Sequence, residues 1–151
     1  MRPAFDDIAG LWHRDGSLRD IYVQDMMAGH WERFDRLLGG YARTYTFDGT
    51  PCPFPGSRAA LANRDGAHLL AIGLNGPALH CHFFVAGQLE LDVSPKDIAG
   101  PGEHARVLAF VERLAHALAL PVDITPENAE HAPFLTYDPV TACWMMHASP
   151  Q

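Results

Sequence analysis

Two stretches of the chain repeat apolar side chains at the spacing of an α-helix. The apolar positions of the first, in residues 26–39 and just beyond, recur three or four residues apart: Trp31, Phe34, Leu38 and Tyr41. A helix of about 3.6 residues per turn places such positions on one face, which can then be buried. Asp25 precedes the stretch and is expected to cap the helix, because its carboxylate can accept from a free backbone N–H.

The second helical stretch is longer and covers residues 102–119. Pro101 suits its start, since the first turn of a helix needs no N–H from that position. Pro121 is expected to stop it. The predicted buried stripe consists of five apolar residues: Val107, Phe110, Val111, Leu114 and Leu118.

Shorter runs of β-branched and aromatic residues, bounded by turn residues, predict strands. Residues 8–24 predict a hairpin that turns at residues 15–16, and the alternation after the turn places Asp20 and Tyr22 on one face. The remaining predictions are strands at 43–47, 122–124, 134–137 and 141–146, a proline-rich loop at 50–56 and a short helix at 57–61.

Residues 68–93 contain three predicted strands joined by two tight turns. The first turn is Asn75-Gly76, a pair that readily adopts positive φ at both central positions of a hairpin turn. The second is Ala86-Gly87, where the glycine is expected to supply a left-handed residue. We expect this meander to form the centre of the sheet.

The order of these elements predicts the fold class. Strands gather around two helices instead of alternating with them, which is typical of an α+β protein with a mainly antiparallel sheet. A chain of 151 residues fits one domain and can form its core without metal or disulfide support. We therefore predict a single α+β domain over residues 1–151, with two helices packed on one face of the sheet.

Composition excludes several classes of protein. No apolar run approaches the roughly 18 residues that cross a bilayer, and two aspartates interrupt the N-terminal segment where a signal peptide needs an apolar core. We therefore expect a cytoplasmic protein without a membrane partner. The three cysteines form no CxxC pair, which argues against a structural zinc site, and no cofactor is predicted.

The negative charge is concentrated in the second half of the chain. The net charge of −7 divides into −1 for residues 1–75, with eight basic and nine acidic residues, and −6 for residues 76–151, with three and nine. An acidic surface repels nucleic acid and attracts a basic partner. The candidates for a partner-binding surface are the acidic residues Glu90, Asp92, Asp97, Glu103, Asp123, Glu127 and Glu130.

His80 and His82 are the main candidates for catalysis or metal binding. They fall on the same side of a predicted strand, because side chains repeat every second residue. Glu90 or Asp92 on the neighbouring strand could add a carboxylate to a metal site. The simpler interpretation is that both histidines occupy the less buried face of the sheet while Cys81 points inward.

The strand register decides which residue each histidine faces. Counting back from the second turn of the meander places His82 opposite Leu91 and His80 opposite Val93. A shift of one step would instead bring an acidic residue opposite a histidine. The sequence leaves both registers open.

Motifs of known enzyme classes are absent from the sequence. It contains no HExxH, no GxSxG, no phosphate-binding P-loop and no GxGxxG. A small metal-dependent or hydrolytic enzyme that uses His80 and His82 is therefore the alternative hypothesis, and a non-catalytic protein is the main one.

Three phrases of the sequence point to a group of bacterial proteins. They are DGSLRDIYV at 15–23, HCHFF at 80–84 followed by QLELDVSP, and LPVDITPEN at 120–128. In this order they resemble small α+β immunity proteins of bacterial toxin systems. The resemblance implies a protein that binds a cognate toxin, which we expect to present a basic face, and blocks the active site of that toxin. It transfers no catalytic residues.

Overall fold

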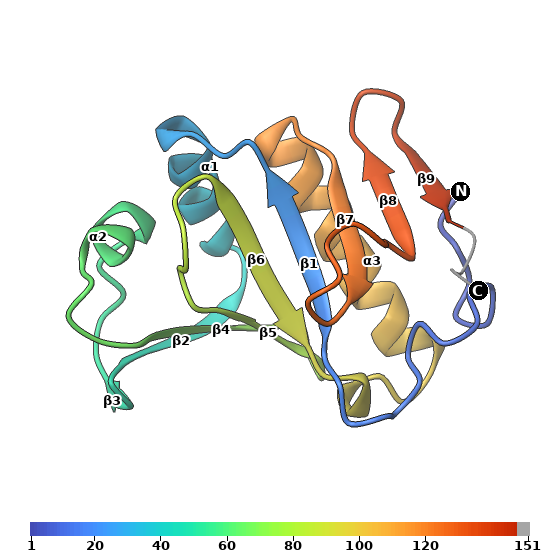
Figure 1. Ribbon diagram of the computed structural model, residues 1–151, viewed down its shortest axis with the longest axis horizontal. Helices are drawn as coiled ribbons and strands as arrows, with labels where there is room; N and C mark the ends of the chain where they lie inside the picture. The colour runs from blue at the N-terminus through green and yellow to red at the C-terminus, as the bar shows by residue number, and fades with distance from the viewer. Residues whose placement is uncertain (148–151) are drawn as a thin grey trace.

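Residues 1–147, which the computed structural model describes, form one nine-stranded sheet with three α-helices (Figure 1). A short 3-10 helix spans Pro95–Asp97. The helices are α1 Ala28–Leu38, α2 Ser57–Ala62 and α3 Pro101–Leu118. The strands are β1 Arg19–Gln24, β2 Ala42–Phe47, β3 Thr50–Pro51, β4 His68–Gly73, β5 Ala78–Cys81, β6 Gln88–Val93, β7 Val122–Pro126, β8 Leu135–Asp138 and β9 Cys143–Met146.

The strands follow the order β3-β2-β4-β5-β6-β1-β7-β8-β9 across the sheet. Every neighbouring pair is antiparallel. The meander β4-β5-β6 occupies consecutive positions and β6 is the middle strand, so the predicted centre of the sheet is confirmed. The predicted fold class, a single α+β domain with an antiparallel sheet, is also confirmed for the described residues.

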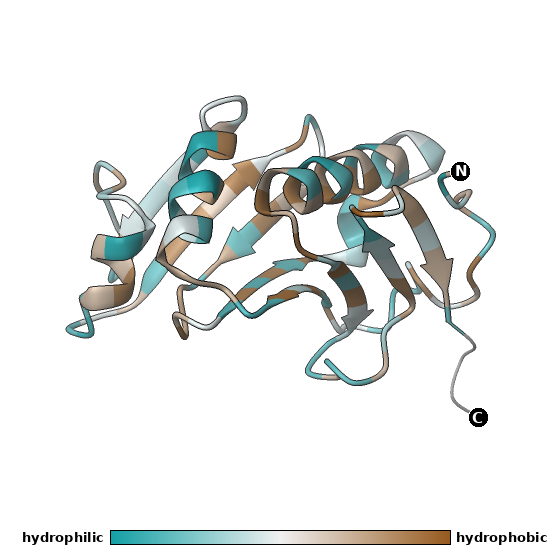
Figure 2. Cartoon of the chain, turned by 90° about the horizontal axis from the view of Figure 1, so that it is seen from above, coloured by the Kyte–Doolittle hydropathy of each residue, from teal (hydrophilic) through white to brown (hydrophobic). Residues whose placement is uncertain are grey.

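The helices α1 and α3 lie over the same face of the sheet (Figure 2). α1 packs against α3 and the short α2, while α3 also contacts β7 and β8. Phe34 of α1 and Phe110 of α3 are fully buried, as the apolar spacing predicted. Burial of a side chain of this size stabilises the fold by roughly 1.5–3 kcal/mol. In the described residues no helix is long and apolar enough to cross a membrane.

The middle strand shows how the two faces of the sheet differ. Leu89, Leu91 and Val93 of β6 point toward the helices and are completely buried. The residues between them, among them Glu90 and Asp92, are half-buried on the opposite face. This strict alternation produces an apolar face under the helices and a polar face away from them.

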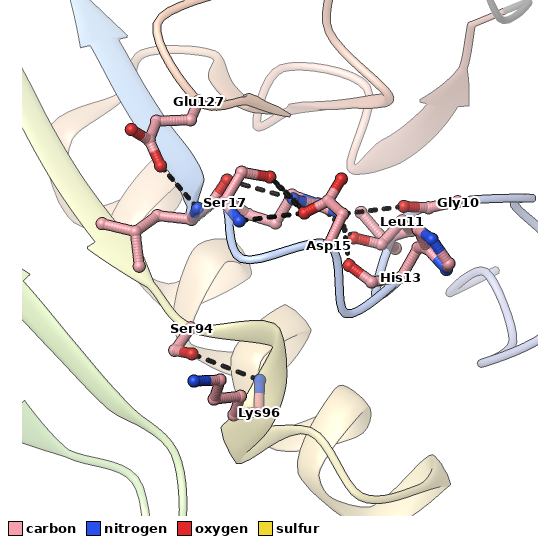
Figure 3. Close-up of polar contacts among 10 residues, drawn as sticks. Gly10, Leu11, His13, Asp15, Ser17, Ser94, Lys96 and Glu127 are labelled. Atoms are coloured by element: carbon pink, nitrogen blue, oxygen red, sulfur yellow. Dashed lines mark hydrogen bonds and ion pairs between the residues drawn. The ribbon is translucent and has the colours of Figure 1, made fainter.

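The predicted hairpin of residues 8–24 is wrong, because only its second half forms a strand, β1. The segment before β1 is a loop closed by Arg19, which is 2% exposed. Figure 3 shows Gly10, Leu11 and His13 of this loop. The guanidinium group of Arg19 donates hydrogen bonds to three backbone carbonyls of the loop, those of Gly10, Leu11 and His13. The side chain therefore replaces the pairing that a second strand would have supplied.

The predicted Asp25 cap of the first helix is also wrong. Asp25 adopts a left-handed backbone conformation with φ of 60°, and Met27 occupies the N-cap position. The backbone N–H of Met27 donates to Nδ1 of His30 at 2.9 Å. A side chain inside the first turn thus performs the capping that Asp25 was expected to perform.

A bulge between β5 and β6 decides between the two registers that the sequence left open, in favour of the one that places His80 opposite Asp92. Cys81 pairs with Leu91, and a bridge joins Val85 to Gln88. Residues 82–84 lie between the paired positions on the β5 side, but only residues 89–90 lie between them on β6, so the β5 side has one extra residue. Because of the extra residue, the pairing of β5 with β6 is shifted by one residue from the register obtained by counting back from the turn at Ala86-Gly87.

Phe83 supplies the left-handed residue of this bulge, where Gly87 had been predicted to supply one. Its φ is 56°, whereas Gly87 has no positive φ. A phenylalanine in this conformation costs about 1–3 kcal/mol. The ring is 4% exposed and lies within about 6 Å of three other rings, those of Trp31, Phe54 and His68. Packing of this ring offsets the backbone strain.

Candidate functional site

A cluster of acidic side chains lies on the helix-free face, where β5, β6 and β1 run side by side. The bulge places His80 opposite Asp92, and on the next strand Asp92 pairs with Asp20. Two residues further along the strands, Glu90 of β6 pairs with Tyr22 of β1. We refer to Asp20, Glu90 and Asp92 as the carboxylate cluster.

The loop between β7 and β8 covers part of the carboxylate cluster and crosses in front of β1 in Figure 1. The backbone N–H of Asn128 donates to the Asp20 carboxylate at 2.8 Å. A carboxylate oxygen of Glu130 accepts from the side-chain amides of Gln88 at 2.6 Å and Gln24 at 3.2 Å. Asp20 is consequently only 4% exposed, although no helix covers this face.

Two members of the carboxylate cluster, Asp20 and Glu90, have a raised pKa. Burial is the main cause of the raised pKa of Asp20, and nearby Asp92 and Glu127 add to it, while hydrogen bonds from Asn128 and Tyr22 oppose it. Burial also raises the pKa of Glu90, and Asp20 and Asp92 act in the same direction. Such mutual repulsion is relieved when a positive group approaches.

No lysine or arginine in residues 1–147 forms an ion pair with the carboxylate cluster. The arginines that form ion pairs do so elsewhere, with Glu112, Asp15, Glu32 and Glu103. Buried or half-buried carboxylates without a lysine or arginine partner are unusual unless they serve a function. The carboxylate cluster is therefore a candidate binding site for a cationic group.

His80 and His82 both reach the carboxylate of Asp92. Nδ1 of His80 lies 3.4 Å from one oxygen and Nε2 of His82 lies 3.5 Å from the other. The hydrogen bond to Asp92 is the main cause of the raised pKa of His80. The expectation that both histidines occupy the less buried face is confirmed, since each side chain is about one-third exposed while Cys81 is buried.

Catalysis or metal binding at this position would require further groups. No serine, threonine or cysteine side chain in the described residues hydrogen-bonds to either imidazole, so neither histidine is paired with a side-chain nucleophile. In residues 1–147, no group of three histidine, cysteine, aspartate or glutamate side chains is placed to hold a metal ion.

Known proteins were compared with the chain by family models, by the sequences of curated proteins and by solved structures. No match was found in any of the three comparisons. The function of the chain must therefore be inferred from its own side chains.

The other predicted partner-binding residues lie at different distances from the carboxylate cluster. Asp123 of β7 accepts a hydrogen bond from the Thr136 hydroxyl at 2.5 Å. Glu127, like Glu130, lies in the loop that covers Asp20, and it accepts from the backbone N–H of Leu18 at 2.6 Å (Figure 3). These acidic residues extend the negative charge around the cluster.

Glu103 lies apart from the carboxylate cluster, whereas Asp97 lies near its histidine side, where its charge adds to the raised pKa of His80. Asp97 ends the 3-10 helix, where its carboxylate is 3.5 Å from the backbone nitrogen of Ala78. Glu103 belongs to the first turn of α3, in the helical layer, and pairs with Arg106 at 3.3 Å. The structure thus brings six of the seven predicted acidic residues to one region, and Glu103 lies outside it.

Asp20 and Tyr22 belong to the site but were not among the predicted binding residues. The hydroxyl of Tyr22 donates to Asp20 at 3.1 Å. The alternation in β1 had placed both on one face, but the half of the chain that contains them is almost neutral. The charge distribution along the sequence therefore did not indicate Asp20 and Tyr22, which join the site only because β1 pairs with β6.

The contact between His80 and Asp92 predicts a pH dependence of stability. Because the folded pKa of His80 is raised, its protonation stabilises the native state at low pH, and this stabilisation is lost as pH rises through the folded pKa. The variant Asp92→Asn should therefore show a smaller loss of stability between about pH 6 and pH 8 than the unaltered protein. Urea unfolding at both pH values measures the difference, with the exposed Asp6→Asn as control. Identical pH slopes in Asp92→Asn and the unaltered protein would refute the contact.

Proposed function

We propose that this chain is a non-catalytic immunity-type protein, which binds and neutralises a cognate toxin through the helix-free face of its sheet. The observation that carries this proposal is the carboxylate cluster, in which Asp20, Glu90 and Asp92 crowd together with no lysine or arginine paired to them in the described residues and with two histidines at Asp92 alone. A lysine or arginine from a partner would relieve the repulsion and supply the missing charge-assisted hydrogen bonds. The resemblance of three sequence phrases to immunity proteins supports the same function.

The cluster is suited to binding because its side chains are held in place before a partner arrives. Asp20, Glu90 and Asp92 project from paired strands, and Asp20 is fixed further by Asn128. Little conformational entropy is lost when such a surface is bound. The surrounding negative charge of Asp123, Glu127 and Glu130 would steer a basic partner to the face and accelerate association.

A hydrolytic enzyme that uses His80 and His82 is the less favoured function. The two imidazoles share Asp92, and His82 lines a small cavity of about 220 Å3. A histidine–carboxylate pair can act as a general base. The same contacts also place two imidazoles against Asp92 of the carboxylate cluster, however, and this explains the geometry without substrate chemistry.

Capture of the partner from the host tests the proposal directly. The tagged protein should retain one basic protein from a lysate of its host, identified by mass spectrometry. The double variant Glu90→Lys/Glu130→Lys should then weaken binding to that purified partner at least about 100-fold, since it places two positive charges where the partner presents its own. Titration calorimetry at about 50 and 300 mM NaCl should show weaker binding at the higher salt concentration.

The control for this experiment is Glu32→Lys, which reverses an exposed charge on α1 without touching the helix-free face. It should leave the affinity within about twofold of the unaltered protein, as expected for a charge outside the interface. The proposal fails if no stable partner is captured, or if Glu32→Lys and the double variant weaken binding equally while circular dichroism shows both folded.

A further inference from the structure

Two hollows meet at the start of β2. The larger, of about 790 Å3, lies between β2 and the proline-rich loop and reaches Phe54. The smaller, of about 360 Å3, lies between α3 and the turn that joins β4 to β5. Tyr41 and Ala42 line both, so the two hollows adjoin at these residues, and together they are called the depression. Each volume falls within the range of about 300–1,000 Å3 that is typical of small-molecule sites.

Three arginines line this depression: Arg43 in the larger hollow, and Arg106 and Arg113 in the smaller one. Arg106 pairs with Glu103 at 3.3 Å. Arg113 donates to the hydroxyl of Tyr41 at 3.1 Å. Neither Arg43 nor Arg113 forms an ion pair with a carboxylate in residues 1–147, so two positive charges face the depression without compensation.

The role of Arg43 is partly structural. Its guanidinium donates to the carbonyl of Leu38, the last residue of α1, at 2.9 Å, and to that of Tyr41 at 3.2 Å. An arginine in this position satisfies carbonyls that a helix end leaves free. Arg113 has no comparable backbone partner in the described residues. It is therefore the clearest candidate for a ligand-binding side chain.

The basic depression is unexpected in a chain whose net charge is −7. A chance cluster of arginines on an acidic protein would be expected to attract its carboxylates, as Arg2 and Arg58 do elsewhere. Two arginines line the smaller hollow and Arg43 lines the adjoining one. Because two of the three have no carboxylate partner in the described residues, they produce a local positive potential. Such a potential selects anions.

Aromatic side chains line the same depression. The rings of Tyr41 and Phe110 lie 5.1 Å apart at its smaller end, and those of Tyr45 and Phe54 lie 5.3 Å apart at its larger end. Tyr41 is half-buried and presents both a ring and a hydroxyl group where the two hollows join. Arginine with aromatic rings is the combination that binds a flat molecule carrying an anionic group.

We propose that this depression binds a small organic anion, a flat ring that carries a phosphate or carboxylate group. Arg113 and Arg106 hold the oxyanion through charge-assisted hydrogen bonds, while the ring lies against Tyr41. The site shares no residue with the carboxylate cluster and does not depend on the proposed toxin binding.

The proposal is tested with three probes on the full chain: adenosine monophosphate for a phosphorylated ring, 4-hydroxybenzoate for a ring with a carboxylate, and inorganic phosphate for the oxyanion alone. We expect at least one ring-bearing probe to bind with a dissociation constant below about 1 mM and to shift the NMR signals of Tyr41 and Arg113. The double variant Arg106→Gln/Arg113→Gln should weaken this binding at least about tenfold, because it removes two charged donors.

The matched control is Arg14→Gln/Arg33→Gln, which removes two exposed arginines that line neither hollow. It should bind the probe as the unaltered protein does. Tyr41→Leu should weaken the ring-bearing probe but leave inorganic phosphate unchanged. Equal weakening by both double variants, binding of inorganic phosphate alone, or no response to any probe at about 10 mM would each overturn the proposal.

Discussion

Replacement of Phe83 by alanine should lower the free energy of unfolding by about 3–5 kcal/mol, as is usual when a buried phenylalanine is truncated. The ring is 4% exposed and packs between Trp31, Phe54 and His68, with ring centroids 6.1, 5.7 and 6.1 Å away. No smaller side chain can fill the space between α1, the proline-rich loop and β4. Urea unfolding followed by tryptophan fluorescence measures the change.

Phe84 provides the control for this prediction, because it is the same residue type one position further along and is 55% exposed. Phe84→Ala should cost less than about 1 kcal/mol, as expected for an exposed side chain. A third variant tests the backbone. Glycine tolerates the φ of 56° at position 83 better than alanine does. Phe83→Gly should therefore be no less stable than Phe83→Ala, and a clearly less stable glycine variant would contradict the left-handed bulge.

The bulge at Phe83 also determines the geometry of the carboxylate cluster. The extra residue places His80 opposite Asp92, where an unbroken ladder would place it opposite Val93. If Phe83→Ala removes the bulge, His80 loses its contact with Asp92 and the cause of its raised pKa. NMR titration of the His80 ring would then report a lower pKa. Packing on one face of the sheet is thus coupled to electrostatics on the other.

The elements that the sequence predicts correctly are those whose apolar pattern is local. The stripe from Val107 to Leu118 defines α3 almost to the residue, and alternation in β6 separates Leu91 from Asp92. These signals depend only on helix and strand periodicity. The fold class follows from them, because the number and order of the elements leave few arrangements.

The site depends on pairing that no local pattern contains. Asp20 and Asp92 are far apart in the sequence and meet because β1 inserts beside β6. The register at His80 depends on one residue, Phe83, whose left-handed conformation is stabilised by rings from distant elements. Sequence periodicity predicts which face a side chain occupies, but tertiary packing decides which side chain lies opposite.

Local periodicity also failed to predict the loop before β1, which is held by tertiary contacts of Arg19. Replacement of Arg19 should have a large effect on stability. Arg19 shares the buried face of β1 with Ile21 and Val23, which is a position where a charged residue needs partners. The structure supplies those partners as backbone carbonyls, which accept from every nitrogen of the guanidinium group. One buried side chain thus organises a loop that has no strand pairing of its own.

Arg19→Met should therefore lower the free energy of unfolding by at least about 3 kcal/mol, because methionine fills similar space but leaves several buried carbonyls without donors. The stability of Arg19→Lys should lie between those of Arg19→Met and the unaltered protein. An ammonium group can donate to only some of the backbone carbonyls that the planar guanidinium group satisfies. Arg14→Met, in the same loop but exposed, should change stability by less than about 0.5 kcal/mol. Hydrogen exchange should show faster exchange in residues 10–17 of Arg19→Met before global unfolding. If Arg19→Met is as stable as Arg14→Met, the loop before β1 is held by contacts other than those of Arg19, and the prediction is wrong.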